Sequence, residues 1–170
     1  MNEKHLKANY GLGKAFLSQN NNEGIVYLER VINISEKYLE EQFIKYYINA
    51  CKHIYNYYIR QRYNEKAQEY YNKIINHSEI VEYAKNEREV LTFKDELILH
   101  DLDEDHVNRI INVLNKHPEI SEAYLTKKKV IYFENSPVYV LGIMVKGMYN
   151  YEKVIKKLID TGLNVNFDFL

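Results

Sequence analysis

Residues 54–75 read IYNYYIRQRYNEKAQEYYNKII. Apolar and aromatic side chains recur three or four positions apart on both sides of a polar stretch that contains Arg62 and Asn64. This spacing places them on one face of each of two α-helices. Because the polar connection is short, the two helices must run antiparallel. The stretch therefore predicts a helical hairpin in which the small residue Ala67 permits a close approach of the two helices.

An earlier pair of segments has the same layout. Residues 10–16 read YGLGKAF, and residues 24–32 read GIVYLERVI, with Gly24 in the small position. The two pairs together resemble tetratricopeptide repeats, and the resemblance implies an array of helical hairpins over residues 3–77 that binds a protein or peptide partner. Two features depart from that family. Gly24 and Ala67 lie 43 residues apart instead of about 34, and the usual proline after each second helix is absent, so another helical hairpin bundle remains an alternative.

The composition is that of a folded chain. Of 170 residues, 46% are hydrophobic and 28% are charged, whereas disorder requires fewer apolar residues and more net charge. The formal net charge is −1, which argues against nucleic acid as a partner. The single cysteine, Cys51, cannot form an intramolecular disulfide and indicates a reducing compartment.

Two domains are expected, because the sequence period changes near residue 94. Residues 1–93 contain no proline and have helical periodicity throughout. The asparagine-rich stretch 20–22 and the stretches 62–64 and 76–78 favour turns. These signals predict helices over about 3–20, 23–35, 38–61, 63–77 and 79–90.

Residues 94–170 alternate between strand-like and helical segments. Strands are predicted at 96–100, 121–127, 129–133, 137–146 and 165–169, with a turn at 134–136. One helix is capped by Asp103 and ends at His117-Pro118, and a second is capped by Asn150. This order predicts a small ferredoxin-like α/β sandwich. The expected fold class is therefore α+β, with helical hairpins at residues 1–93 followed by the sandwich at 94–170.

The second half also carries a family resemblance. Residues 122–125, 137–143 and 165–170 look like parts of the C-terminal domain of the enhanced-serine-sensitivity protein family of bacteria. The resemblance implies no catalytic residue.

The densest group of potential metal ligands is His100, Asp101, Asp103 and His106. Imidazole and carboxylate are suitable ligands for zinc or manganese, so a metal-dependent regulator or enzyme is one hypothesis. The competing interpretation is structural: Asp103 caps a helix, and the acidic residues after it complement the helix dipole. Without a second signal, no metal or other cofactor is expected.

No catalytic motif was found. Cys51 lies among apolar residues of a predicted helix, with no histidine one turn away on its face, so it is expected to be a buried small hydrophobe. The sequence lacks the nucleophile elbow, the phosphate-binding loop and the dinucleotide-binding glycine pattern. A non-enzymatic interaction module is therefore the preferred hypothesis.

The helical half is rich in tyrosine, and two interpretations remain open. Adjacent tyrosines cannot share one helical stripe, so part of the set lies on a second face, where it can form a recognition surface or fill wide gaps between helices. The eight tyrosines concerned are Tyr46, Tyr47, Tyr55, Tyr57, Tyr58, Tyr63, Tyr70 and Tyr71. For the recognition surface we predict a groove that binds a peptide or partner helix and contains Tyr47, Tyr58 and Asn64, with Lys45, Arg60 and Arg62 contacting acidic groups.

The remaining expectations concern assembly and location. Residues 165–169 predict a final edge strand whose polar residues would not block backbone pairing, so a homodimer through Val165, Phe167 and Phe169 is expected; a purely structural self-association protein is a further alternative. The longest apolar stretch, 138–145, is too short to cross a bilayer, and residues 1–6 do not resemble a secretory signal. These features predict a cytoplasmic protein without a membrane partner.

Overall fold

The computed structural model describes residues 3–147 and 150–161 and belongs to the α+β class. The chain divides into two compact units. The helical unit comprises residues 1–87 together with 131–136, and the α/β unit comprises residues 88–130 and 137–170. The first division therefore falls at 87/88, against the expected 93/94, and a short segment from the second half of the sequence belongs to the helical unit.

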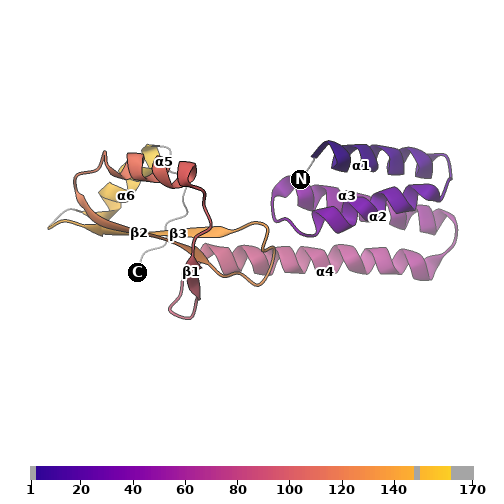
Figure 1. Cartoon of the computed structure of the whole chain (residues 1–170). Helices are drawn as coiled ribbons and strands as arrows, with labels where there is room; N and C mark the ends of the chain where they lie inside the picture. Colours follow the sequence, from indigo (N-terminus) through magenta and orange to yellow (C-terminus); the bar gives the residue numbers. More distant parts are fainter. Residues whose placement is uncertain (1–2, 148–149, 162–170) are drawn as a thin grey trace. The chain divides into compact units, whose positions relative to one another are not determined.

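Four helices build the helical unit: α1 (Glu3–Ser18), α2 (Glu23–Ser35), α3 (Glu41–Arg60) and α4 (Asn64–Glu89) (Figure 1). The first three agree with the predicted ranges to within three residues. The predicted break at 76–78 is wrong, because α4 continues through it. The hydroxyl of Ser78 donates to the carbonyl of Ile74, four residues back, at 2.9 Å, and so bonds within the helix instead of capping a new one.

The α1–α2 pair depends on two facing glycines. A methyl group at Gly13 would lie 2.6 Å from Cγ of Leu28 and 2.9 Å from the carbonyl oxygen of Gly24. A methyl group at Gly24 would lie 2.5 Å from the carbonyl oxygen of Gly13. Both positions are therefore restricted to glycine by the close approach of two backbones, as the small-residue position at Gly24 predicted.

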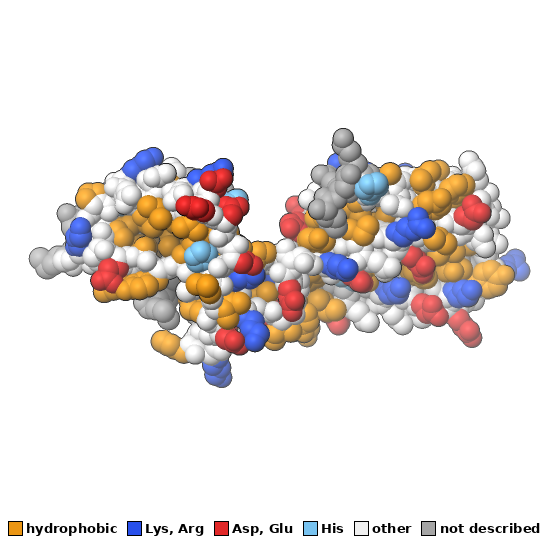
Figure 2. Space-filling model, in the orientation of Figure 1, with side chains coloured by type: hydrophobic (Ala, Val, Ile, Leu, Met, Phe, Trp, Pro, Cys, Tyr) orange, Lys and Arg blue, Asp and Glu red, His pale blue; other side chains and the backbone are white. Residues whose placement is uncertain are grey.

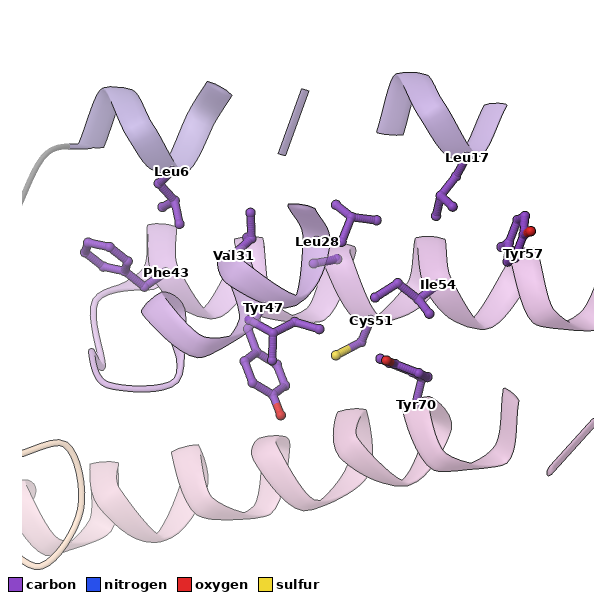
Figure 3. Packing of buried hydrophobic residues seen from close by; sticks show 12 residues of the cluster. Leu6, Leu17, Leu28, Val31, Phe43, Tyr47, Cys51, Ile54, Tyr57 and Tyr70 are labelled. Atoms are coloured by element: carbon purple, nitrogen blue, oxygen red, sulfur yellow. The ribbon is translucent and has the colours of Figure 1, made fainter. Parts of the chain in front are cut away.

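Helix α3 packs in the middle of the unit, between α1 and α4. In Figure 3, Leu6 and Leu17 of α1 point towards α2 and α3, and Tyr70 points towards them from α4. All three side chains are at least 95% buried. The backbones of α3 and α4 lie farther apart than those of α1 and α2, because aromatic rings fill the space between them.

The described residues of the α/β unit form a three-stranded antiparallel sheet in the order β1-β2-β3. Its strands are β1 (Leu97–Leu99), β2 (Ile120–Lys128) and β3 (Val138–Val145), and its helices are α5 (Glu104–Leu114) and α6 (Tyr151–Asp160). Side chains from both helices and from β2 and β3 form one apolar core, centred on Leu141, Val154 and Leu158. One face of the sheet is thereby covered by helices.

Both predicted helix caps are confirmed. The Asp103 carboxylate accepts a hydrogen bond from the backbone N–H of His106 at 2.8 Å, at the start of α5. The Asn150 side chain accepts one from the backbone N–H of Lys153 at 3.2 Å, at the start of α6. Each bond satisfies an N–H group that has no partner within the helix.

Two details of the predicted sandwich are wrong. Residues 129–133 are not a strand: Phe133 has a positive φ of 55°, which ends extended backbone, and β2 and β3 are joined by a loop. Strand β1 pairs with β2 antiparallel, whereas a ferredoxin-like order requires the first strand to lie beside the third. The predicted strand at 165–169, with the dimer edge Val165, Phe167 and Phe169, lies outside the described residues.

The run Lys127-Lys128-Lys129 suggests a charged strand edge, but the structure assigns each lysine a separate acidic partner. Lys127 pairs with Asp101 at 2.7 Å, Lys129 with Glu96 at 2.9 Å, and Lys128 with Asp95 at 3.0 Å. The Lys128 side chain is only 4% exposed and also donates to the carbonyl of Val90 at 2.8 Å. The run therefore connects the segments on both sides of β1 to the end of β2.

The glycine contact can be tested with two substitutions in one helix. Gly11 and Gly13 both lie in α1, but a methyl group at Gly11 would have no described atom within 4 Å. We expect Gly11→Ala to raise the free energy of unfolding by about 0.5–1 kcal/mol through helix propensity. Gly13→Ala should lower it by about 1–3 kcal/mol through overpacking. Urea unfolding followed by circular dichroism measures both, and equal effects of the two changes would contradict the assigned contact.

Candidate functional site

The structure distributes the eight tyrosines between the core and the surface. Tyr47, Tyr57 and Tyr70 are buried, Tyr46, Tyr55 and Tyr58 are half-buried against the same core, and Tyr63 and Tyr71 are exposed. Most of the set therefore fills the space between helices. Burial raises the pKa of the Tyr47 and Tyr70 hydroxyls, and a hydrogen bond to Glu29 adds to the effect at Tyr70.

The predicted groove residues are not gathered in one place. Tyr47 and Tyr58 both face α4, where their rings lie against His77 and Tyr70 at centroid distances of 3.7 and 5.9 Å. The other four are exposed: Lys45 on α3, Arg60 at the end of α3, Arg62 in the turn that follows, and Asn64 at the start of α4. Among these residues, Arg60 alone is directed to α1, because its guanidinium donates to the carbonyl of Leu17 at 3.4 Å.

A pocket of about 420 Å³ lies where Arg60 meets α1. Leu17 and Ile59 supply its apolar wall, and no carboxylate of the described residues lines it. The described residues that line it are Lys14, Leu17, Ser18, His53, Asn56, Ile59 and Arg60. The residues from α3 are spaced by three and four positions, so they share one helical face. The pocket is thus a stripe of α3 set against the last turns of α1.

The charge of this pocket is positive. Neither Lys14 nor Arg60 forms an ion pair among the described residues. His53 forms a hydrogen bond of 3.0 Å with the Tyr10 hydroxyl, and burial together with nearby Lys14 lowers its pKa. At neutral pH the pocket therefore offers two cations and a neutral imidazole, a set that suits an anionic group with an apolar neighbour.

Sequence reasoning found Arg60 but missed Lys14 and His53. The only local signal was the spacing of His53, Asn56 and Arg60 on one face of a helix, and that spacing does not say which neighbouring helix the face meets. On the face of the helical unit that Figure 2 shows, basic and acidic side chains are mixed.

A second cavity, of about 360 Å³, lies on the opposite side of α3, next to α4. Its wall includes Tyr47 of α3, Lys73 and His77 of α4, Glu36 directly after α2, and Phe133 from the segment 131–136. His77 is 5% exposed, and its Nε2 atom has no hydrogen-bond partner among the described residues. Burial lowers the pKa of His77 to about 4, so its ring is neutral at pH 7.

The segment predicted as a metal site is engaged in other contacts. The Asp101 carboxylate accepts from Lys127 Nζ and from the Tyr139 hydroxyl, both at 2.7 Å. Asp103 caps α5 and lies 2.6 Å from Nδ1 of His106. Among residues 3–147 and 150–161, no group of three or more histidine, cysteine or acidic side chains is arranged to hold a metal ion. His100 therefore belongs to no such group.

Cys51 is fully buried, as expected. Burial raises the pKa of its thiol to about 12, and the nearby Lys73 ammonium opposes this effect. Since the thiolate is the reactive form, this cysteine is inert at neutral pH.

Comparison of the chain with protein families, with curated proteins and with solved structures finds no match. In the described part of the chain, no helix has both the length and the apolar character that crossing a bilayer requires.

The neutral state of His77 predicts a pH dependence of stability. Its pKa of about 4 in the folded chain lies below the ordinary value of about 6.5, so protons bind more tightly to the unfolded state. The stabilisation is complete above about pH 6.5 and is lost as the pH falls towards 4. Between pH 7 and pH 4, wild type should lose about 1–3 kcal/mol more of its free energy of unfolding than His77→Phe.

Chemical denaturation at a series of pH values measures this difference. The control is His5→Phe, a change at an exposed histidine of α1, which should retain the wild-type pH dependence. A His77→Phe profile parallel to that of wild type would show that His77 is not held neutral by burial.

Proposed function

We propose that the chain is a non-enzymatic interaction module, and that its helical unit binds an acidic, partly apolar segment of a partner protein in the pocket between α1 and α3. The observation that carries this proposal is the pair Lys14 and Arg60, which lie beside an apolar wall in a pocket that no carboxylate of the described residues lines. A peptide with Asp or Glu next to Leu or Phe complements both features. The partner's acidic groups pair with these two cations, which form no ion pair among the described residues.

The finer description of the helical unit belongs to the same proposal. We treat α1–α2 and α3–α4 as two irregular tetratricopeptide-like hairpins, with Gly24 and the buried Ala67 in the small positions. The pocket then lies between the first helices of successive hairpins, where the stacking of repeats forms an extended binding surface. For the α/β unit, the likeness to the enhanced-serine-sensitivity family remains a prediction, and the β1–β2 pairing argues against a ferredoxin-like order.

The chemistry of the pocket sets the expected strength of binding. Lys14 and Arg60 are exposed, so each ion pair contributes modestly and weakens with added salt. Contact of an apolar side chain with Ile59, which is 44% exposed, adds the free energy of burying apolar surface. This combination favours rapid, micromolar-range association with an acidic segment over tight binding.

A charge-reversal experiment tests this proposal on the full chain. Peptides that bind the wild-type protein are selected from a random-peptide library. The recovered peptides should be enriched in Asp and Glu beside large apolar residues. Fluorescence anisotropy then measures the affinity of one recovered peptide. The variant Lys14→Glu/Arg60→Glu should weaken it by about tenfold or more, equivalent to about 1.4 kcal/mol.

The matched control is Lys45→Glu/Arg62→Glu, which makes the same change of net charge at two exposed cations outside the pocket lining. It should change the affinity by less than about threefold. Equal losses in both double variants would mean that net charge alone attracts the peptide. Recovery of no acidic peptide would remove the basis of the proposal.

A further inference from the structure

The segment Ile131–Ser136 is part of the helical unit, although its neighbours in the sequence belong to the α/β unit. Phe133 is its anchor: the ring is 8% exposed and forms a small core with Val81 and Ala84 of α4. The ring also meets His77 edge-on, with centroids 5.9 Å apart. Ala84 is fully buried, and its small side chain leaves space for the Phe133 ring.

Backbone groups hold the same segment at both ends. The N–H groups of Ile131 and Tyr132 donate to the two oxygens of the Glu87 carboxylate, at 2.8 and 3.5 Å. At the other end, the Ser136 hydroxyl accepts from the backbone N–H of Leu39 at 3.0 Å. Contacts to main-chain groups together with one aromatic anchor in a pocket are the features by which proteins bind extended peptides.

The segment occupies this surface incompletely. Phe133 has the left-handed φ of 55°, a conformation that is unfavourable for a residue with a side chain. The cavity of about 360 Å³ remains beside the segment, and His77 lines it. Nε2 of His77 is buried without a hydrogen-bond partner among the described residues, which costs stability as long as no donor or acceptor reaches it.

We propose that the surface formed by Val81, Ala84, Glu87 and the Tyr47–His77 stack is a peptide-docking site, and that Ile131–Ser136 is an internal ligand which occupies it. The site takes a partner segment of the same chemistry, an extended stretch with an aromatic anchor and exposed backbone N–H groups before it. A partner segment that binds here displaces the internal one. This site is separate from the α1–α3 pocket: the two have no described lining residue in common, and the proposal does not depend on the function of that pocket.

The experiment supplies the internal ligand from outside. A fluorescein-labelled peptide with the sequence of residues 129–137, KVIYFENSP, is titrated into the full-length chain. Wild type should bind it weakly, because its own segment competes. Phe133→Ala removes the internal anchor and should bind the peptide at least tenfold more tightly, and adding Ala84→Leu to that variant should abolish binding by filling the ring's position.

Three controls make the result specific. Phe93→Ala, at an aromatic residue that is 97% exposed, should bind as wild type does. Lys14→Glu/Arg60→Glu should leave the peptide's affinity unchanged, which separates this site from the α1–α3 pocket. Glu87→Ala removes the carboxylate that accepts hydrogen bonds from the backbone of the internal segment and of the added peptide. In the Phe133→Ala background it should therefore lower the affinity for the peptide. Circular dichroism checks the folding of every variant.

The proposal is overturned if folded Phe133→Ala binds the peptide no better than wild type or Phe93→Ala. It is also overturned if Ala84→Leu has no effect. Should wild type instead form a dimer in light scattering that Phe133→Ala abolishes, the occupant is a second copy of the chain and a distinct partner segment is excluded.

Discussion

The close approach of Gly13 and Gly24 is the constraint on which the helical unit depends. With no side chain at either position, the carbonyl oxygen of each glycine lies within 2.9 Å of the place that the other's methyl group would take. This contact sets how deeply α1 lies against α2, and it thereby brings the last turns of α1 to the face of α3 that carries His53 and Arg60. A larger residue at either glycine would move α1, and the basic pocket would change its width.

The interface between α3 and α4 follows the opposite rule. Between α3 and α4, rings keep the backbones apart: Tyr47 stacks on His77, and Tyr58 lies against Tyr70. Rigid rings cannot fill every volume between two helices, and the cavity left beside His77 is lined on one side by a segment from another part of the chain. The two pockets thus have different origins. The basic α1–α3 pocket depends on the close glycine contact between α1 and α2, and the cavity beside His77 depends on the large rings between α3 and α4.

Part of the candidate site could be read from the sequence. Arg60 was assigned to acidic groups, and it lines the basic pocket. Tyr47 and Tyr58 were assigned to a groove, but they face α4. The aromatic and helical periodicity could not separate these faces, since a tyrosine stripe on a helix has the same spacing whether it meets solvent or a wide interface. Lys14 was missed because its contribution depends on which helix lies across from it.

The features of the fold that depend on local interactions could be predicted from the sequence alone. The helix α2, the caps Asp103 and Asn150 and the small position at Gly24 all depend on residues within a few positions of one another or on a simple period. Contacts between distant residues were decided by the tertiary structure alone. The N–H of Ile131 meets Glu87 across 44 positions, and β1 pairs with β2 across α5. No pattern within either segment encodes such a pairing, because an unpaired backbone group or carboxylate takes whatever complementary partner the packing of the core brings to it.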